Sequence, residues 1–401
     1  MFISARMIII IGLFMRLIIA IWNGFFEFDF GQQADPLSFH GWAVRFLENP
    51  TISNCEENIR HVMSCILGYI YFMMPFDVTD DSLFIGSLIS VLAWCLSAFI
   101  LLKIMNILLV EKSHQRKAMF IYALLPSSVI ITSVTLREPY QLLFVNLAVF
   151  AALKIYWDKS LLHWLTMFFA IYFMSLMHAG LIVFGIYILA SALILQTCRR
   201  YKSGLVKLKL AFVLPILVLI VVLGLEMLIS LKGGFHKGYG KLSDGVLPAI
   251  QNYQEGGIKA SAGSNAAYRD SIELKDTSDL ILFIPTSLFQ YLFEPMPWRA
   301  SRPKDMAILL ENLLRAYLIW KAWAGFRKVS GKMKNVIFYL IISYFALETI
   351  WAQGTMNWGT AARHHVPGLG LLVLSAFAYS KPRRLKSKPL TSVNDDIIPG
   401  N

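Results

Sequence analysis

Long apolar runs alternate with short polar turns along most of this chain. A helix needs about 20 apolar residues to cross the hydrocarbon core of a bilayer, and most of the runs come close to that length. The pattern predicts an all-α polytopic membrane protein with about ten transmembrane helices, at residues 7–23, 83–109, 118–135, 140–156, a hairpin of two spans around 178–180, 210–231, 306–323, 336–350 and 366–378. Two further runs, 61–76 and 281–293, are short for a full span and are predicted to lie on the outer surface. If both cross instead, the count is twelve.

Basic residues fix the orientation of this path. Lys and Arg cluster at alternate ends of the runs, around residues 112–117, 199–209, 327–334 and 381–388. Because cytoplasmic loops are enriched in Lys and Arg, all four clusters are predicted to be cytoplasmic. The prediction is one transmembrane domain, 1–380, with periplasmic segments at 25–82 and 232–305 that include surface helices. A cytoplasmic basic tail follows at 381–401.

Composition agrees with a membrane protein. Hydrophobic residues make up 57% of the chain and charged residues 15%, more apolar surface than a soluble core of this length could hide. The net charge of +12 is explained by the cytoplasmic clusters, so it does not indicate nucleic acid. The four cysteines have no metal-site spacing, although Cys55 and Cys65 share one outer segment and could pair. The outer loop 233–279 is rich in Gly, Ser and Asn and is predicted to be mobile.

Polar residues gather at the predicted outer ends of the spans. They form four sets: Asp29 and Asp35 with Glu27; Arg137 and Glu138; His178; and Asn357, Arg363, His364 and His365. Ionisable groups at a bilayer boundary are unfavourable unless they pair or line a wet cavity, so their gathering indicates function.

Each set also has a purely structural explanation. Asp35 before Pro36 is a good helix start, Arg137 and Glu138 could pair within a turn, and His178 could be a structural histidine. Arg363 could contact lipid headgroups at a helix end. Arg16, inside the first span, has no obvious partner in the sequence.

Short motifs in these segments resemble a known group of enzymes. An acidic residue on a surface helix after the first span, followed by Leu136-Arg137-Glu138 after the third, is similar to GT-C-type glycosyltransferases. This group includes bacterial lipid A aminoarabinose transferases and protein mannosyltransferases. The stretches that resemble its envelope-polysaccharide and O-antigen polymerase-like members are Pro126-Ser127-Ser128, Phe293-Glu294-Pro295-Met296-Pro297-Trp298 and the segment from Asn357 to Pro367.

The resemblance implies an inverting transfer of sugar or repeat units from a polyprenyl phosphate or pyrophosphate donor. The acceptor is a glycan or a lipid-linked sugar, the active site faces the periplasm, and the localisation is the bacterial inner membrane. In this interpretation a carboxylate removes the proton of the acceptor hydroxyl, and fixed cations hold the departing phosphate.

The same resemblance implies a role for each polar residue. Asp35 is the expected base, with Asp29 as the alternative because the acidic pair of the family is here interrupted by Pro36. Glu138 assists, Arg363 and Arg137 clamp the phosphate, and His364 and His365 hydrogen-bond to it. The residues expected to contact substrate are His178, Trp298 and Asn357. No cofactor is predicted with certainty, although a carboxylate pair could hold a divalent cation.

The main alternative is a transporter or flippase for lipid-linked sugars. Transporters favour inverted repeats, broken helices and charges inside the membrane. The sequence has no internal repeat, and most of its charges lie at the outer edge, so the enzyme is the favoured hypothesis.

Overall fold

The computed structural model describes residues 3–26, 34–51, 55, 62–74, 83–158, 160–178, 180–200, 246–261, 265–269, 272 and 274–379. This part of the chain is all-helical, apart from one isolated bridge between Ala267 and Asn357. The helices are α1 (Ala5–Phe25), α2 (Ala34–Phe46), α4 (Val62–Phe72), α5 (Phe84–Ile107), α6 (Lys112–Leu124), α7 (Pro126–Ile131), α8 (Glu138–Asp158), α9 (Leu161–Met177), α10 (Leu181–Arg200), α12 (Val246–Ser261), η1 (Thr277–Asp279), α13 (Leu280–Phe293), α14 (Pro303–Lys328), α15 (Gly331–Ala352), α16 (Trp358–His364) and α17 (Leu369–Phe377). Asp29, the predicted span 210–231 and the basic tail lie outside the described residues.

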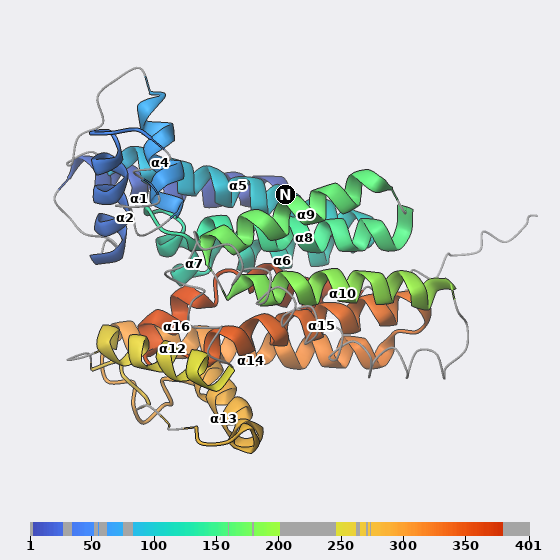
Figure 1. Cartoon of the computed structure of the whole chain (residues 1–401). Helices are drawn as coiled ribbons and strands as arrows, with labels where there is room; N and C mark the ends of the chain where they lie inside the picture. Colours follow the sequence, from blue (N-terminus) through green and yellow to red (C-terminus); the bar gives the residue numbers. More distant parts are fainter. Residues whose placement is uncertain are drawn as a thin grey trace, which may run out of the picture.

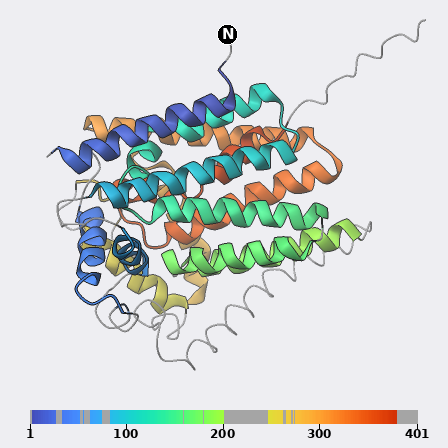
Figure 2. The same cartoon turned by 90° about the horizontal axis from the view of Figure 1, so that it is seen from above.

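The long helices run side by side in one bundle, and α2, α4 and α12 lie at one end of it (Figures 1 and 2). Four described helices are long and apolar enough to cross a membrane: α1, α5, α8 and α15. Their surfaces suit lipid, since Phe14 on α1 is 64% exposed and Leu96 on α5 is 57% exposed. Among the described residues, the other predicted spans form helices that are shorter or carry more charge.

The short helix α17 occupies the position predicted for the last span. All nine of its residues are buried. It packs against α14, α15 and α6, so protein surrounds it on several sides. A helix that is apolar all round is expected where it is enclosed in this way. The apolar run in the sequence therefore reflects burial in the bundle as much as contact with lipid.

The predicted third span is broken into two helices. α6 ends at Leu124 and α7 begins at Pro126, and Leu125 between them has an extended backbone. Proline lacks the N–H that would continue the helix, and its ring clashes with the carbonyl four residues earlier. The prediction of one continuous span over 118–135 is wrong for this reason.

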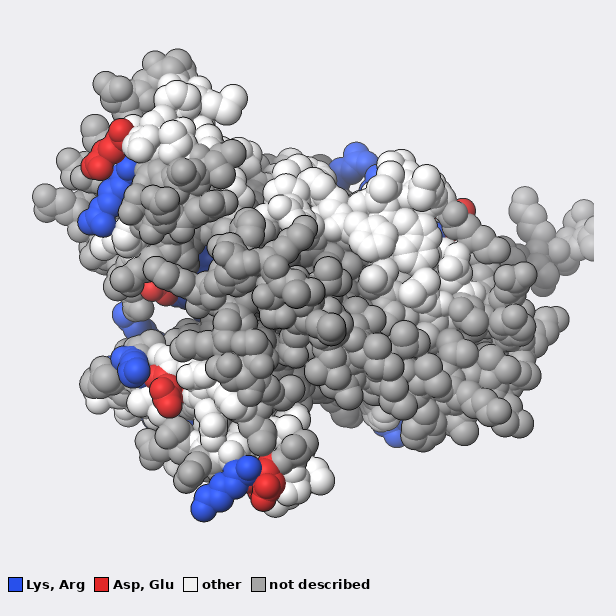
Figure 3. Space-filling model, in the orientation of Figure 1, with Lys and Arg blue, Asp and Glu red and all other residues white. Residues whose placement is uncertain are grey.

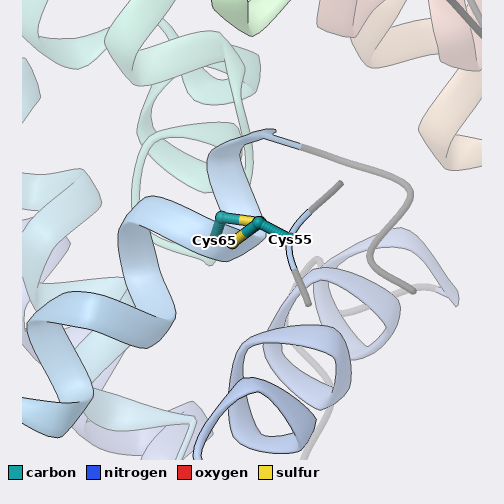
Figure 4. The surroundings of a disulfide bond; sticks show 2 residues. All are labelled: Cys55 and Cys65. Atoms are coloured by element: carbon teal, nitrogen blue, oxygen red, sulfur yellow. A yellow bond between two sulfur atoms is a disulfide. The ribbon is translucent and has the colours of Figure 1, made fainter. Parts of the chain in front are cut away.

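A disulfide bond between Cys55 and Cys65 ties the chain near α2 to α4, with a Cα–Cα distance of 5.8 Å (Figure 4). An apolar cluster holds the same region together: Phe39 of α2, Met63 of α4, Val134 and Leu136 before α8, and Met177 at the end of α9. These contacts place the start of α2 next to the turn that precedes α8.

The described part of the outer loop is docked, whereas the sequence predicted a mobile segment. α12 packs closely on the turn after α15, because a Cβ at Gly354 would overlap the ring of Tyr253. Beyond α12, the Tyr268 hydroxyl donates to the Thr355 carbonyl at 2.7 Å. Arg269 Nη2 donates to the carbonyls of Ala352, Gln353 and Thr355 at the end of α15. Arg269 thus satisfies carbonyls that have no partner within the helix.

Candidate functional site

Three of the predicted site residues meet at the end of the bundle that carries α2. Arg363 Nε donates to Glu138 Oε1 at 2.7 Å, and Arg363 Nη1 donates to Asp35 Oδ2 at 2.5 Å. The residues come from α16, from the first turn of α8 and from the first turn of α2. The structure therefore joins three segments, the outermost 328 residues apart in the sequence, into one cluster, here called the Arg363 cluster.

Exposure changes steeply across the Arg363 cluster. The side chain of Glu138 is 1% exposed, that of Arg363 19% and that of Asp35 55%. Burial works against the charge on Arg363, but the attraction and hydrogen bonds of Glu138 and Asp35 outweigh it and raise its pKa. Among the described residues, Glu138 Oε2 has no hydrogen-bond partner. The buried carboxylate anchors the arginine, and the exposed carboxylate is accessible to solvent.

Arg137 supplies a second cation beside the Arg363 cluster. Its guanidinium lies 5.1 Å from the centre of the Phe39 ring, and Nη1 donates to the Met177 carbonyl at 3.4 Å. Its Nε is buried and has no hydrogen-bond partner among the described residues. Burial is the main cause that lowers the pKa of Arg137, partly offset by the charge of Glu138. Two cations and two carboxylates therefore leave this group of side chains close to neutral.

The surface is notched at this end of the molecule. Figure 3 shows the notch between the lobe that holds α2 and α4 and the lobe that holds α12, with acidic and basic side chains at its rim. The half-exposed carboxylate of Asp35 lies on α2, at the same end. Solvent therefore reaches the Arg363 cluster at Asp35.

His178 is a neutral hydrogen-bond donor. Its Nδ1 accepts the N–H of Gly180 at 3.1 Å, so in the neutral ring the proton lies on Nε2. Burial, together with the charges of Arg137 and Arg363, lowers its pKa to about 3. The ring is therefore neutral, with its one N–H at Nε2, and the predicted contact of His178 with substrate stays a prediction.

His364 is oriented differently. Its Nδ1 lies 3.0 Å from Thr355 Oγ1, and that hydroxyl donates its own proton to the Trp351 carbonyl at 2.7 Å. The Nδ1 of His364 must then donate, which leaves Nε2 as an acceptor in the neutral ring. Burial and the charge of Arg363 lower its pKa well below the usual range. The sequence suggested that His364 binds the phosphate. A neutral ring with an acceptor at Nε2 is poorly suited to that role.

His365 faces a separate group of residues. Its Nδ1 lies 2.6 Å from Glu348 Oε2 and its Nε2 lies 3.2 Å from the Tyr291 carbonyl. Both ring nitrogens are engaged, so this side chain has no free nitrogen to offer a phosphate. Its neighbour Val366 and the side chain itself line a small pocket with Arg315 and Glu311 of α14.

Asn357 and Trp298 do not contact the Arg363 cluster in the described part of the chain. The Asn357 side chain caps α16 by accepting the N–H of Thr360 at 2.7 Å, and its amide donates to Ser261 Oγ at 2.8 Å. Its role is to fix the start of the helix that carries Arg363. Trp298 is 81% exposed at the surface before α14. Such a position suits an aromatic side chain at a membrane–water interface.

The described residues contain no group of three His, Cys, Asp or Glu side chains that could hold a metal ion. Asp35 and Glu138 are bridged by Arg363, so the cation between these two carboxylates is a guanidinium.

Two charged residues inside the bundle were not explained by the sequence: Arg16 was noted without a partner, and Glu311 was missed. Arg16 is fully buried and contacts the break between α6 and α7, and Glu311 contacts the same break from α14. Pro126 was the available signal, because a proline inside an apolar span frees backbone groups that need polar partners.

No family model, curated protein or solved structure matches this chain.

Proposed function

We propose that this chain is a GT-C-like, inverting membrane glycosyltransferase. It transfers sugar or repeat units from a polyprenyl phosphate or pyrophosphate donor to a glycan or lipid-linked acceptor during envelope polysaccharide assembly, with repeat-unit polymerisation as one form of the reaction. The observation that carries the proposal is the position of Arg363 between the exposed carboxylate of Asp35 and the buried carboxylate of Glu138.

This arrangement couples donor binding to activation of the base. A phosphate that binds Arg363 competes with Asp35 for the guanidinium, while Glu138 keeps the arginine in place. Asp35, released from the ion pair, accepts the proton of the acceptor hydroxyl. The hydroxyl oxygen then attacks the anomeric carbon, and the electrons of the breaking C–O bond move to the phosphate. Arg363 and Arg137 stabilise the charge that develops there.

The disulfide supports a site on the non-cytoplasmic side. Disulfides form and persist in oxidising compartments such as the bacterial periplasm. Cys65 lies on α4, which packs on α2, and α2 carries Asp35. The basic clusters in the sequence predict the same orientation. We therefore propose that the protein is a multi-pass inner-membrane protein with its active site at the periplasmic face.

The test is product formation in a strain that lacks the gene and carries each variant. Asp35→Asn should abolish the surface polysaccharide, because an amide cannot accept the proton. If Asp35 only stabilises the first turn of α2, the same variant should leave product near normal, because losing a carboxylate from the first turn costs at most about 1 kcal/mol. Arg363→Lys should reduce product by roughly tenfold to a hundredfold, because lysine cannot bind two partners as a planar fork. Asp158→Asn, an exposed acid at the end of α8, is the matched control.

The form of the product separates the two kinds of transfer. On a gel, loss of a polymerase leaves single-repeat material, whereas loss of a single-sugar transferase changes the mass of each repeat. Product of normal amount from both Asp35→Asn and Arg363→Lys, at normal protein level, would overturn the proposal.

A transporter of lipid-linked sugars is the second candidate, favoured by one specific observation. The break between α6 and α7 and the buried Arg16 resemble the broken helices and intramembrane charges of transporters. The two functions differ in covalent chemistry. Vesicles containing the protein, a lipid-linked donor and an acceptor form a new glycosidic bond if it is an enzyme, and only relocate the donor if it is a transporter.

A further inference from the structure

The break between α6 and α7 separates the donor and the acceptor of a backbone hydrogen bond that a continuous helix would make. In a continuous helix the Ser127 N–H would donate to the Ala123 carbonyl. Here the Ala123 carbonyl accepts from Arg16 Nη1 at 2.7 Å, and the Ser127 N–H donates to Glu311 Oε1 at 2.8 Å. Arg16 of α1 therefore takes the place of the missing N–H donor, and Glu311 of α14 takes the place of the missing carbonyl acceptor.

Arg16 also holds the far end of α7. Its Nε donates to Thr132 Oγ1 at 2.6 Å, directly after the helix, and its Nη2 donates to Ser128 Oγ at 3.3 Å. The guanidinium lies 3.6 Å from the centre of the Trp94 ring. One side chain thus contacts the residue before the break, the first turn of α7 and the residue that follows α7.

These charges lie deep in the bundle. At about 1.5 Å per residue, Arg16 is roughly 17 Å along α1 and Glu311 is roughly 12 Å along α14. Arg16 is fully buried and Glu311 is 8% exposed. Charged residues at such depth are unfavourable unless their interactions serve a purpose. A plain membrane helix would need neither residue.

The break is connected directly to the Arg363 cluster. Thr132 is six residues before Glu138, and the described chain between them contains no further helix. Leu136 in this connection packs in the apolar cluster with Phe39 of α2. The direction of α7 therefore sets where Arg137 and Glu138 lie.

We propose that Arg16 and Glu311 are positioning residues that hold the bend at Pro126 and thereby place Arg137 and Glu138 against Arg363. This inference rests on the proposed function for its activity readout. The pocket beside the break makes the role of Glu311 specific, because Leu125 and Ser127 face Leu314 and Glu311 across this space. The carboxylate is the polar link between α14 and the break.

A cross-link gives a readout that does not depend on catalysis. The pair Leu125→Cys and Leu314→Cys, introduced with Cys95→Ser and Cys198→Ser, places one thiol on each side of the pocket and leaves Cys55–Cys65 intact. A short bifunctional thiol reagent should join them in the parent protein. Glu311→Leu should lower the cross-linking yield and reduce product roughly tenfold or more. Glu311→Gln retains an acceptor oxygen for the Ser127 N–H and should stay near the parent in both measurements.

Two further variants separate positioning from stability. Pro126→Ala allows the Ser127 N–H to return to the Ala123 carbonyl. Added to Glu311→Leu, it should restore thermal stability but not product, because a straight helix redirects the chain toward Glu138. Arg16→Lys, which cannot reach Ala123, Ser128 and Thr132 together, should lower product while the protein still accumulates. It serves as the test if Glu311→Leu does not accumulate.

The results distinguish this inference from the proposed function. Normal cross-linking and normal product in both Glu311→Leu and Arg16→Lys, with none from Asp35→Asn, would overturn the positioning role alone. Full recovery of product by Pro126→Ala in Glu311→Leu would also overturn it. Normal product from Asp35→Asn and Arg363→Lys would overturn the proposed function, while the cross-linking result would still decide whether Glu311 holds the bend.

Discussion

Arg16 and Arg363 are both largely buried arginines, but they are neutralised in different ways. Arg16 donates to two carbonyls and two hydroxyls and stacks on Trp94, and no solvent reaches it. Arg363 instead donates to two carboxylates, of which one, Asp35, is half exposed. Solvent does not reach the first arginine, whereas in the proposed mechanism an anion displaces Asp35 from the second.

The first arginine has only structural partners, whereas in the proposed mechanism the second exchanges a carboxylate for a ligand. Arg16 donates to backbone carbonyls and to the hydroxyls of short side chains. Another partner could take their place only if the break between α6 and α7 rearranged. Arg363 is held by the buried Glu138, and in the proposed mechanism a phosphate exchanges with the exposed Asp35. Substitutions should therefore separate the two regions by whether stability, activity or both change.

The largest effect is expected from Arg363→Met. It leaves the buried carboxylate of Glu138 without its partner and should lower the free energy of unfolding by about 3 to 5 kcal/mol, with complete loss of product. Adding Glu138→Gln removes the uncompensated charge and should restore most of the stability but no product. Lys154→Met, in a partly exposed pair with Asp158, is the control and should change stability by at most about 1 kcal/mol. Thermal unfolding in detergent and the polysaccharide gel measure both quantities. If the double variant regains product, Arg363 does not bind the donor.

A smaller effect is expected where the outer segment docks. Arg269→Ala removes the hydrogen bonds to Ala352, Gln353 and Thr355 and should cost about 1.5 to 3 kcal/mol. Because the turn they fix leads directly into α16, product should fall along with stability. Arg302→Ala, 50% exposed before α14, is the matched control. Limited proteolysis should cut the 246–279 segment faster in Arg269→Ala. Unchanged proteolysis and product would show that the docked segment does not hold α16.

The smallest effect of a single side chain is expected in mild acid. Folding lowers the pKa of His178, His364 and His365 below the usual 6.5, with burial as the first cause in each. Below that pH these histidines bind protons in the unfolded chain but not in the folded chain. The free energy of unfolding is therefore highest above about pH 6.5 and falls as the pH drops. Each buried histidine should lower the free energy of unfolding by at most about 1.4 kcal/mol per pH unit below 6.5. The unfolding temperature should therefore fall between pH 7.5 and 5.5, and less so in His364→Gln. An equal fall in that variant would remove His364 from this explanation.

The sequence located the residues of the Arg363 cluster but not their contacts. Asp35, Glu138 and Arg363 attract attention because each is ionisable and lies next to the end of an apolar run. Their pairing depends on the packing of α2, α8 and α16, which no local pattern encodes. The roles suggested for His364 and His365 depended on which ring nitrogen is free, and that is decided by Thr355, Glu348 and Tyr291.

The helical class and the positions of most long helices also followed from the apolar pattern. The break at Pro126 did not, because the residues around it are as apolar as those of an unbroken span. The partners of Arg16 were hidden for a related reason. They are a freed carbonyl and two hydroxyls more than 100 residues away, and none of them carries a charge that the sequence would display.

The bond between Cys55 and Cys65 adds a step to the maturation of this protein that follows the synthesis of the chain. In the proposed orientation the bond forms only after the segment carrying α2 and α4 has left the cytosol, where thiols are kept reduced. A newly made chain therefore carries Asp35 on a segment that is not yet covalently fixed. In that orientation its approach to Glu138 and Arg363 is covalently fixed only after oxidation has joined the two sulfurs.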